Sequence, residues 1–391
     1  MRGAFVLAGR YIAYHKGKTL VVVACLSLTI YLPITLHWLV RHLQASLTAR
    51  AASSPMIVAA KGSRFDVAFC SLYFSVAAPE MIAMEDLNEV GESPRIQPIP
   101  LHVRFRAKGF PVVGTTADYF SFRNLKVAQG EHWNRLGDCL LGQAVARQLG
   151  LSPGDKLQTD PENMFDLAGE FPLTMRVIGV LAGSDSVDDQ TVFVSLKTAW
   201  VIAGIGHGHS GKSKKHNTQG SGSVANAGVK THTEITAENV DSFHFHGDES
   251  EFPISVILAV SDDEKSATLL LGRYLDPDAT LQVVRPSIVI NDLMKMVFRV
   301  QSILDFAAIV LAVVTVCFIV LVMSLSLRLR RREMETMFKL GGSRGLIVSL
   351  QLAELVIVLL ISAAVAAILV ALTVWLAPST FQSWVMGMVS S

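Results

Sequence analysis

The sequence has few charged residues and no excess of either sign. Only 17% of its 391 residues are Asp, Glu, Lys or Arg, and 34 basic residues against 33 acidic ones leave a net charge of +1. Proteins that bind nucleic acid through bulk electrostatics carry a basic excess, so we expect no nucleic-acid partner. Hydrophobic residues make up 51% of the chain, which is typical of a membrane protein that also carries a soluble domain.

Cysteine is scarce, with four residues in the chain. Cys25 and Cys317 lie within apolar runs, where they are expected to act as small apolar residues. Cys70 and Cys139 lie in a stretch predicted below to be outside the cytoplasm, where an oxidising compartment permits a disulfide. The sequence leaves open whether these two side chains meet. A recognisable catalytic constellation is also missing, so we do not expect an enzyme.

Three apolar runs are long enough to cross a membrane, since about 20 apolar residues suffice. We predict transmembrane helices at residues 19–41, 301–327 and 346–377. The first is interpreted as an uncleaved membrane helix rather than a signal peptide, because bulky residues fill its far end. Residues 42–300 contain no run of this length and are predicted to form one folded domain.

Basic residues are concentrated on one side of these runs. Residues 1–18 contain four basic residues and no acid, and residues 328–345 contain six basic residues between the second and third runs. Short loops rich in Lys and Arg stay in the cytoplasm, so we predict both segments to be cytoplasmic and residues 42–300 to be external. The first segment has an amphipathic pattern, and residues 378–391 are predicted to form a short external tail.

The connector at residues 328–345 combines its charges with apolar residues at helical spacing. We predict a short amphipathic helix at the inner membrane surface, ended by Gly341 and Gly342. One interpretation is that its arginines only orient the protein in the membrane. The other is that the helix docks a cytoplasmic partner. In the third run, Glu354 is expected either to face the helix bundle or to extend towards Arg344, and we favour the second.

The string from Arg330 to Arg344, Arg-Arg-Arg-Glu-Met-Glu-Thr-Met-Phe-Lys-Leu-Gly-Gly-Ser-Arg, carries a family resemblance. It resembles the segment after a membrane helix in FtsX-like ABC transporter permeases, a superfamily that includes the MacB and LolC/LolE types. The opening Ala8–Thr19 is similar to their amphipathic first segment. The resemblance implies coupling to a separate ATPase, which alone would bind ATP. The residues it assigns to coupling are Arg331, Arg332, Glu333, Met334, Met337, Phe338, Gly341, Ser343 and Arg344.

Strand and helix patterns alternate along residues 42–300, which indicates a mixed α+β domain. Gly114–Phe120, Leu141–Asp155 and Val192–Ala199 resemble, in this order, phrases of the MacB-like periplasmic core domain. The predicted fold class is therefore an α-helical transmembrane protein with three membrane helices and a large extracytoplasmic mixed α+β domain. The predicted strands include Pro55–Ala60, Arg95–Phe105, Phe110–Gly114, Asp138–Gly142, Leu173–Leu181, Gln190–Val194, Phe252–Val260 and Leu281–Arg285, and the predicted helices include Gln143–Leu149, Leu196–Ile205 and Asp262–Tyr274.

The resemblance implies a function as the membrane subunit of an FtsX/MacB-type ABC transporter in the bacterial inner membrane. Two copies of the chain would pair with two cytoplasmic ATPase subunits, and a periplasmic adaptor or substrate protein is a further expected partner. Members of this group convert ATP-driven closure of the ATPases into movement of the external domains. Two rival hypotheses remain: a regulator like FtsX that activates an external hydrolase, and a zinc-linked transporter or sensor. The family usually has four membrane helices, so either this member has three or the sequence lacks the fourth.

Residues 204–251 form an insertion rich in Gly, Ser, Lys and His, which contains six of the eleven histidines. Its low hydrophobicity predicts a flexible loop, and one interpretation is a solvated linker with incidental histidines. The other is a metal site, because neutral imidazole is a common zinc ligand and the spacing of His244 and His246 places both on one face of a strand. The ion could be zinc or another divalent transition metal. The candidate ligands are His207, His209, His216, His232, His244, His246 and Asp248.

Overall fold

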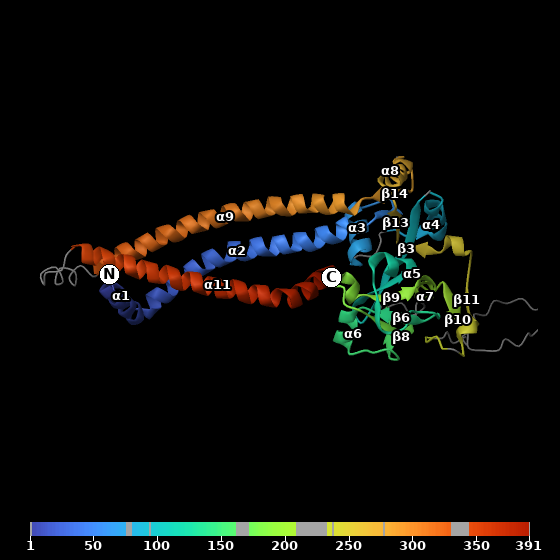
Figure 1. The fold of residues 1–391 in the computed structure, drawn as a ribbon, viewed down its shortest axis with the longest axis horizontal. Helices are drawn as coiled ribbons and strands as arrows, with labels where there is room; N and C mark the ends of the chain where they lie inside the picture. Colours follow the sequence, from blue (N-terminus) through green and yellow to red (C-terminus); the bar gives the residue numbers. More distant parts are fainter. Residues whose placement is uncertain are drawn as a thin grey trace, which may run out of the picture. The chain divides into compact units, whose positions relative to one another are not determined.

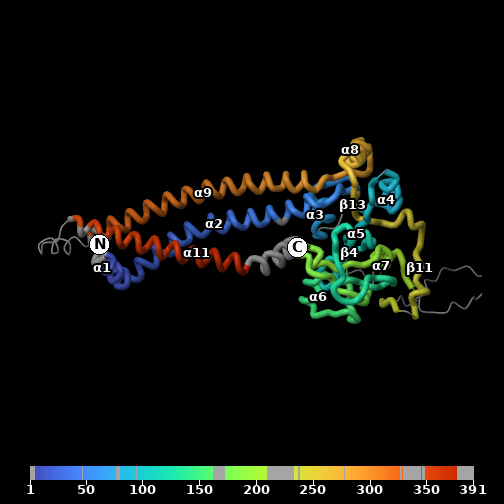
Figure 2. Tube along the Cα trace, viewed as in Figure 1, coloured from blue at the N-terminus to red at the C-terminus, as the bar shows by residue number. Residues whose placement is uncertain are grey.

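The structure is a computed structural model that divides into two compact units. The helical unit comprises Met1–Ala49 and Ile290–Val385, and the second unit comprises Met386–Ser391 and the α+β domain, Arg50–Val289. The α+β domain therefore lies in the sequence between the two segments that build the helical unit (Figure 2). The structure describes residues 2–75, 80–93, 95–161, 172–208, 233–236, 238–276, 278–329 and 344–390.

Long helices dominate the helical unit (Figure 1). They are α1 (Arg2–Tyr14), α2 (Lys16–Ala52), α9 (Pro286–Leu329) and α11 (Arg344–Ser390). Among the described residues, three helical segments are long and apolar enough to cross a membrane: Lys16–Ala52, Pro286–Leu325 and Val348–Leu376. These agree with the three predicted membrane helices.

Side-chain hydrogen bonds connect α2 to both of the other long helices. The hydroxyl oxygens of Thr29 and Thr315 lie 3.1 Å apart between α2 and α9, and those of Tyr31 and Thr373 lie 2.9 Å apart between α2 and α11. Hydroxyl side chains commonly hold membrane helices together, because lipid offers no alternative hydrogen-bond partner. These contacts place α2 beside both α9 and α11.

The last helix is longer than the sequence predicted. We expected the third span to end at Ala377 and residues 378–391 to form a separate tail, but α11 continues through Pro378 to Ser390. The apolar segment itself, Val348–Leu376, agrees with the predicted span, and the external position of the tail stays a prediction. Proline is tolerated inside membrane helices, where local adjustments and neighbouring groups satisfy the carbonyl left without a donor.

Glu354 lies on α11, where the sequence analysis expected it to extend towards Arg344. The side chain of Arg344 lies outside the part of the chain that the structure describes, so that pairing stays a prediction. The ion pair that the structure describes is with Lys18, whose Nζ lies 3.7 Å from a carboxylate oxygen of Glu354. The reason is the packing of α1 on this part of α11, where Ala8 and Ala353 are both buried in one small apolar cluster. This packing brings the start of α2 close to Glu354.

A mixed sheet of ten strands forms the centre of the α+β domain. Its strands are β1 (Met56–Ala60), β3 (Ile96–Ala107), β4 (Phe110–Thr115), β5 (Val127–Gly130), β6 (Asp138–Leu141), β7 (Lys156–Gln158), β8 (Thr174–Leu181), β9 (Val192–Ser195), β13 (Val256–Ser261) and β14 (Leu281–Val284). The order is β14-β1-β13-β3-β4-β9-β6-β8-β5, with β7 paired to β8. The pairs β4–β9 and β6–β8 are parallel and the other neighbours antiparallel.

Shorter elements complete this domain. Two separate two-stranded ribbons pair β2 (Ile82–Ala83) with β12 (Pro253–Ile254), and β10 (Gly206–Gly208) with β11 (Phe243–Phe245). The helices are α3 (Arg64–Tyr73), α4 (Met84–Gly91), α5 (Ala117–Arg123), α6 (Gln143–Leu149), α7 (Leu196–Ile202) and α8 (Glu264–Arg273), and the 3₁₀ helices are η1 (Val187–Gln190), η2 (Val240–Ser242) and η3 (Glu249–Glu251).

Strand β9 illustrates why the central sheet is buried on both faces. Its residues Val192, Phe193 and Val194 are all fully buried, in a continuous apolar run without the polar alternation of a half-exposed strand. Because side chains alternate between the two faces, Phe193 packs with Tyr119 in one apolar cluster, whereas Val192 and Val194 belong to another. A strand of this composition fits only the interior of the sheet.

Most of the predicted elements of this domain are confirmed, with one strand boundary wrong. The predicted strands Arg95–Phe105 and Phe110–Gly114 correspond to the antiparallel pair β3–β4, and α6 has the predicted bounds Gln143–Leu149. The predicted strand Phe252–Val260 is divided at Ser255 into β12 and β13. The backbone amide of Ser255 donates to the Leu101 carbonyl, and its hydroxyl accepts from the Val103 amide, so the chain changes partner there.

No disulfide joins Cys70 and Cys139, which are both buried. Burial raises the pKa of the Cys139 thiol, so this side chain behaves as an inert apolar group. The possibility of a disulfide that the sequence left open is therefore not realised in this structure.

Candidate metal site and buried ion-pair network

The ribbon of β10 and β11 brings histidines from two separate parts of the insertion together. In its antiparallel register His207 lies directly opposite His244. Directly opposite residues point to the same face of a two-stranded ribbon. The backbone amide of His246 donates to the carbonyl of Ile205 at 3.3 Å, which extends the pairing beyond β11. His246 is two residues after His244 and therefore lies on that same face.

The other face of the ribbon packs on the core of the α+β domain. The ring centroid of Phe245 lies 6.5 Å from that of Trp200 and 6.0 Å from that of Phe252. A Cβ atom at Gly206 would lie 2.7 Å from the Phe245 ring, which leaves no space for a larger residue. Because Phe245 points inwards, the histidines on either side of it must point outwards.

A second aromatic ring covers the other glycine of β10. A Cβ atom at Gly208 would lie 2.7 Å from the ring of Phe243, so only glycine fits opposite that residue too. The sequences Gly-His-Gly and Phe-His-Phe-His therefore form one complementary unit. Its rings lie over glycines on one face, and its imidazoles are on the other.

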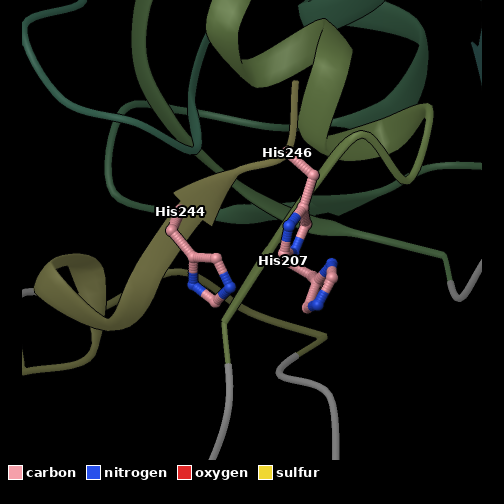
Figure 3. A group of neighbouring side chains, drawn as sticks. All are labelled: His207, His244 and His246. Carbon is pink, nitrogen blue, oxygen red and sulfur yellow. The ribbon is translucent and has the colours of Figure 1, made fainter. Parts of the chain in front are cut away.

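The three imidazoles converge (Figure 3). One ring nitrogen from each of His207, His244 and His246 lies within 4.8 Å of the others. In a tetrahedral zinc site with bonds of about 2.0–2.1 Å, the ligand nitrogens lie about 3.4 Å apart. Side-chain rotations that move the ring nitrogens by roughly an ångström would bring them to this spacing. His207 is half-buried, while His244 and His246 are exposed. A metal here would remain accessible to water and to exchange.

A backbone carbonyl orients one of these rings. Nδ1 of His244 lies 3.2 Å from the carbonyl oxygen of Ser242. Because a carbonyl only accepts, Nδ1 carries the proton and Nε2 presents its lone pair. Hydrogen bonds of this type fix the tautomer of metal-ligating histidines.

The remaining candidate ligands do not join this group in the part of the chain that the structure describes. The carboxylate of Asp248 instead accepts a hydrogen bond from the backbone amide of Ser250 at 3.0 Å, which lowers the pKa of that carboxyl. It acts as the N-cap of η3. The candidates His209, His216 and His232 lie outside the described residues.

The insertion also contains a string with the spacing of a phosphate-binding loop, which our sequence analysis overlooked. Gly206–Ser213 matches Gly-x-x-x-x-Gly-Lys-(Ser/Thr). Such a loop needs a strand before it and a helix after it, with free backbone amides cradling phosphate. Here α7 precedes the string, and Gly206–Gly208 is itself the strand β10, paired with β11. The local context therefore does not support nucleotide binding.

A buried ion-pair network holds the last turn of α2 in the α+β domain. Arg50 donates from Nη1 to Oδ2 of Asp188 at 2.8 Å and from Nη2 to Oδ1 at 3.1 Å. The side chains of Arg50 and Asp188 are only 9% and 2% exposed. The Arg50 guanidinium also donates from Nε to the carbonyl of Leu72. A bidentate arginine–carboxylate pair fixes distance and orientation together.

Two hydroxyl groups complete the shell of Asp188. The Tyr119 hydroxyl donates to Oδ1 at 2.7 Å, and the Ser186 hydroxyl donates to Oδ2 at 2.8 Å. Burial alone would raise the pKa of Asp188, but the charge of Arg50 and these hydrogen bonds outweigh burial and lower it to about 2. Burial raises the pKa of Tyr119, which therefore remains a neutral donor. The carboxylate is ionised and fully partnered.

A second contact secures the segment just after α2. The Ser54 hydroxyl donates to the Arg50 carbonyl at 2.6 Å and accepts from Nη2 of Arg123 at 2.8 Å. Sequence analysis missed the whole network. Its strongest signal was an arginine in the last turn of a long helix, but the acid that pairs with it is 138 residues away.

The coupling residues implied by the family resemblance lie almost entirely outside the described part of the chain. Helix α9 ends at Leu329 and α11 begins at Arg344, and Arg344 is the only coupling residue within a described element. The other eight remain predictions.

Comparison with known proteins identifies a matching family and similar solved structures. The family model for the MacB-like periplasmic core domain matches residues 19–242, which is more than half of the chain. The comparison with curated proteins found no similar sequence. The periplasmic region of MacB from Actinobacillus actinomycetemcomitans is similar at 14% identity and a TM-score of 0.34, covering 61% of this chain and 92% of that one. The extracellular domain of the noncanonic ABC-type transporter YknZ from Gram-positive bacteria is similar at 12% identity and a TM-score of 0.33, covering 59% and 98%.

Proposed function

Because the chain belongs to the family with a MacB-like periplasmic core domain, the permease components of MacB/FtsX-type ABC transporters, we propose that it transmits ATP-driven movement from a separate ATPase to its α+β domain. The family implies an ATPase partner. ATP would bind and be hydrolysed there, and the present chain would act as a mechanical element without catalytic activity of its own.

The observation that carries the proposal is the buried ion pair between Arg50, in the last turn of α2, and Asp188 of the α+β domain. Helix α2 runs without interruption from Lys16 to Ala52, and its last turn already belongs to the α+β domain. Likewise α9 begins within that domain at Pro286 and continues to Leu329. Both connections between the units are therefore helical.

The Arg50–Asp188 ion pair fixes the last turn of α2 to η1. Separating Arg50 from Asp188 would leave two charges buried without partners, which is strongly unfavourable in a protein interior. Displacement of the end of α2 should therefore displace η1 with it. Because η1 leads directly into β9 of the central sheet, force on the helix would reach the sheet within a few residues.

We further propose that two copies of the chain pair with two ATPase subunits in the bacterial inner membrane. The three apolar helices found in the described part of the chain support a membrane-spanning protein, and the α+β domain would lie on the external side. A periplasmic adaptor or substrate protein would bind the domain there. The basic bias of residues 1–18 and of the connector 328–345 supports this orientation.

Site-directed labelling tests the orientation. Cys25 and Cys317 are first replaced by serine, because both are exposed and could react with the label. Cys70 and Cys139 are kept, because both are buried. A membrane-impermeant maleimide added to intact spheroplasts should label Glu92→Cys on the exposed surface of the α+β domain. It should label Lys339→Cys in the connector only after the membrane is permeabilised. The opposite labelling pattern would contradict the proposed topology.

Replacement of connector residues tests the coupling. We expect Phe338→Ala and Glu333→Gln to weaken docking of the ATPase, with a loss of about 2 kcal/mol for a central aromatic anchor. The measurement is ATPase binding and ATP turnover of the reconstituted complex. Thr336→Ala is the matched control, because it changes the same segment at a position without an assigned coupling role. If all three variants bind and stimulate the ATPase like the wild type, the connector is only a topology signal.

A further inference from the structure

We propose that His207, His244 and His246 form a binding site for a divalent transition metal of the zinc class, with solvent in the fourth position. The proposal goes beyond the mechanical function and does not depend on it. It is carried by three imidazoles that come from two strands and place a ring nitrogen each within 4.8 Å of the others.

The arrangement is built into the ribbon by its sequence. His207 and His244 are cross-strand partners. The distances between ring centroids are 5.2 Å for this pair, 4.9 Å for His207 and His246, and 4.8 Å for His244 and His246, so the three rings form a compact triangle. The opposite face is anchored by Phe245 on Trp200. The core therefore fixes which face the histidines occupy, while the histidines themselves contribute nothing to the core.

A purely structural role does not account for this triangle. Two of its three rings are exposed, so little apolar surface is removed from water by bringing them together. A metal ion accounts for the triangle, because it binds one nitrogen of each ring and draws the same three rings together.

The donor set indicates the class of metal. The cluster offers imidazole nitrogens without a thiolate or a carboxylate among its three ligands. Magnesium and calcium prefer oxygen ligands, whereas imidazole suits zinc, copper and nickel. Zinc imposes no preferred geometry of its own and commonly binds three protein ligands together with water. We therefore assign the site to zinc.

Binding would join β10 to β11 outside the central sheet. Residues 209–242 lie between the two strands in the sequence, so a metal bound to both strands would link the residues on either side of that segment. Strand β10 begins after three intervening residues from the end of α7, which packs on the domain core through Trp200. Occupancy should therefore slow hydrogen exchange in β10 and β11 and leave the central sheet unchanged.

Zinc titration of the full-length chain tests the site directly. The chain is purified in detergent without a polyhistidine tag, and zinc is titrated against a chromophoric chelator. We expect one strong site per chain. Loss of a hydrogen-bonding partner around a metal ligand typically costs about 10- to 100-fold in affinity, so loss of a ligand itself should cost at least as much. Each of His207→Ala, His244→Ala and His246→Ala should therefore weaken binding at least about tenfold.

The insertion provides its own matched control. A variant with His209, His216 and His232 all replaced by alanine changes as many histidines of the same insertion but leaves the cluster intact. It should bind zinc within about twofold of the wild type, while replacement of the three cluster histidines should abolish the site. The three cluster substitutions are at a ribbon outside the core, and retained hydrogen-exchange protection of the central sheet confirms that the variant is folded.

A spectroscopic readout distinguishes the cluster from adventitious binding. Cobalt(II) in place of zinc should give the intense visible absorption of a tetrahedral site in the wild type and in the control variant, and lose it in the cluster variant. Absence of zinc binding by the wild type at micromolar concentration would overturn the proposal. Equal affinity of the wild type and the cluster variant, or loss of binding in the control variant, would overturn it too.

Discussion

Two polar clusters of the α+β domain differ in nearly every physical respect. The side chains of Arg50 and Asp188 are buried, and hydroxyl groups of Tyr119 and Ser186 occupy the remaining oxygen positions of the carboxylate. The histidine cluster instead lies on an exposed ribbon and directs three nitrogens at a common point. A buried network whose partners are all supplied by the protein stabilises a structure. An exposed set of convergent donors is arranged for a ligand.

The same contrast extends to the consequences of removing a residue. A buried charge that loses its partner retains the full cost of its desolvation. An exposed imidazole that is removed leaves its neighbours in water, so the folded state changes little. Stability measurements should therefore respond to the first cluster, and metal binding to the second.

The largest expected effect is on Asp188→Ala. Breaking a buried ion pair from one side should lower the free energy of unfolding of the α+β domain by about 3–5 kcal/mol. The measurement is the denaturant dependence of Cys139 labelling, because this thiol is buried in the same domain and reacts only when the domain opens. His244→Ala, in the other cluster, should change the same quantity by less than about 0.5 kcal/mol.

The neighbouring acid provides a control for this prediction. The carboxylate of Asp189 accepts hydrogen bonds from the amide and the hydroxyl of Ser184 rather than from an arginine. Asp189→Ala should therefore cost only about 1 kcal/mol. Equal effects of the two substitutions would mean that the Arg50–Asp188 pair has no special part in the fold.

Acid should remove a somewhat smaller amount of stability through the same carboxyl. Its pKa of about 2 in the folded domain is below the ordinary value of 3.8. The stabilisation is therefore complete above about pH 4 and is lost as the pH falls towards 2, and one pKa unit corresponds to about 1.4 kcal/mol, which gives a total of roughly 2 kcal/mol. Urea unfolding with pulse proteolysis by pepsin between pH 4.5 and pH 2.5 measures this. Asp188→Asn should have a shallower pH dependence, and an unchanged slope would assign the acid sensitivity to other groups.

Tyr119→Phe should have a smaller effect on the same network. The substitution removes the 2.7 Å hydrogen bond to Asp188 and keeps the aromatic ring in the core. A hydrogen bond to a charged group contributes about 1.5 kcal/mol or somewhat more, so the domain should lose roughly that much stability, measured by Cys139 labelling. A change below about 0.5 kcal/mol would indicate that the ion pair does not need this hydroxyl.

A smaller change in stability than that of Tyr119→Phe is expected from Gly206→Ala, and it sharpens the contrast between the clusters. The new methyl group would lie 2.7 Å from the Phe245 ring and displace β10 from β11. We expect a loss of only about 1 kcal/mol in the domain, in line with an ordinary point substitution, together with a several-fold loss of zinc affinity. Gly109→Ala, in the turn between β3 and β4, is the control, because it should leave zinc affinity unchanged. Unaltered zinc affinity of Gly206→Ala would contradict the role of the ribbon in positioning the histidines.

The sequence predicted what depends on local pattern. Apolar runs predicted the three long helices, and alternating strand and turn signals predicted β3, β4 and α6 with nearly correct bounds. The fold class followed from those elements. The break at Ser255 was missed because the partner of that residue is on another strand.

The candidate sites show the same limit. His244 and His246 could be paired from their spacing alone, since alternation along a strand is a local property. Selecting His207 from the other candidates, and leaving Asp248 aside, required the register of β10 on β11. The Arg50–Asp188 pair could not be predicted at all, because no local pattern relates a residue on α2 to one on η1.

Hydrogen exchange of the reconstituted complex tests the central claim, the transmission of movement, most directly. The chain and its ATPase are compared with and without a non-hydrolysable ATP analogue, and exchange is measured in the last turn of α2 and in η1. Transmission predicts a nucleotide-dependent change in both segments that is lost in Phe338→Ala. A response confined to the ATPase and the connector, with Arg50 and Asp188 unaffected by nucleotide, would contradict it.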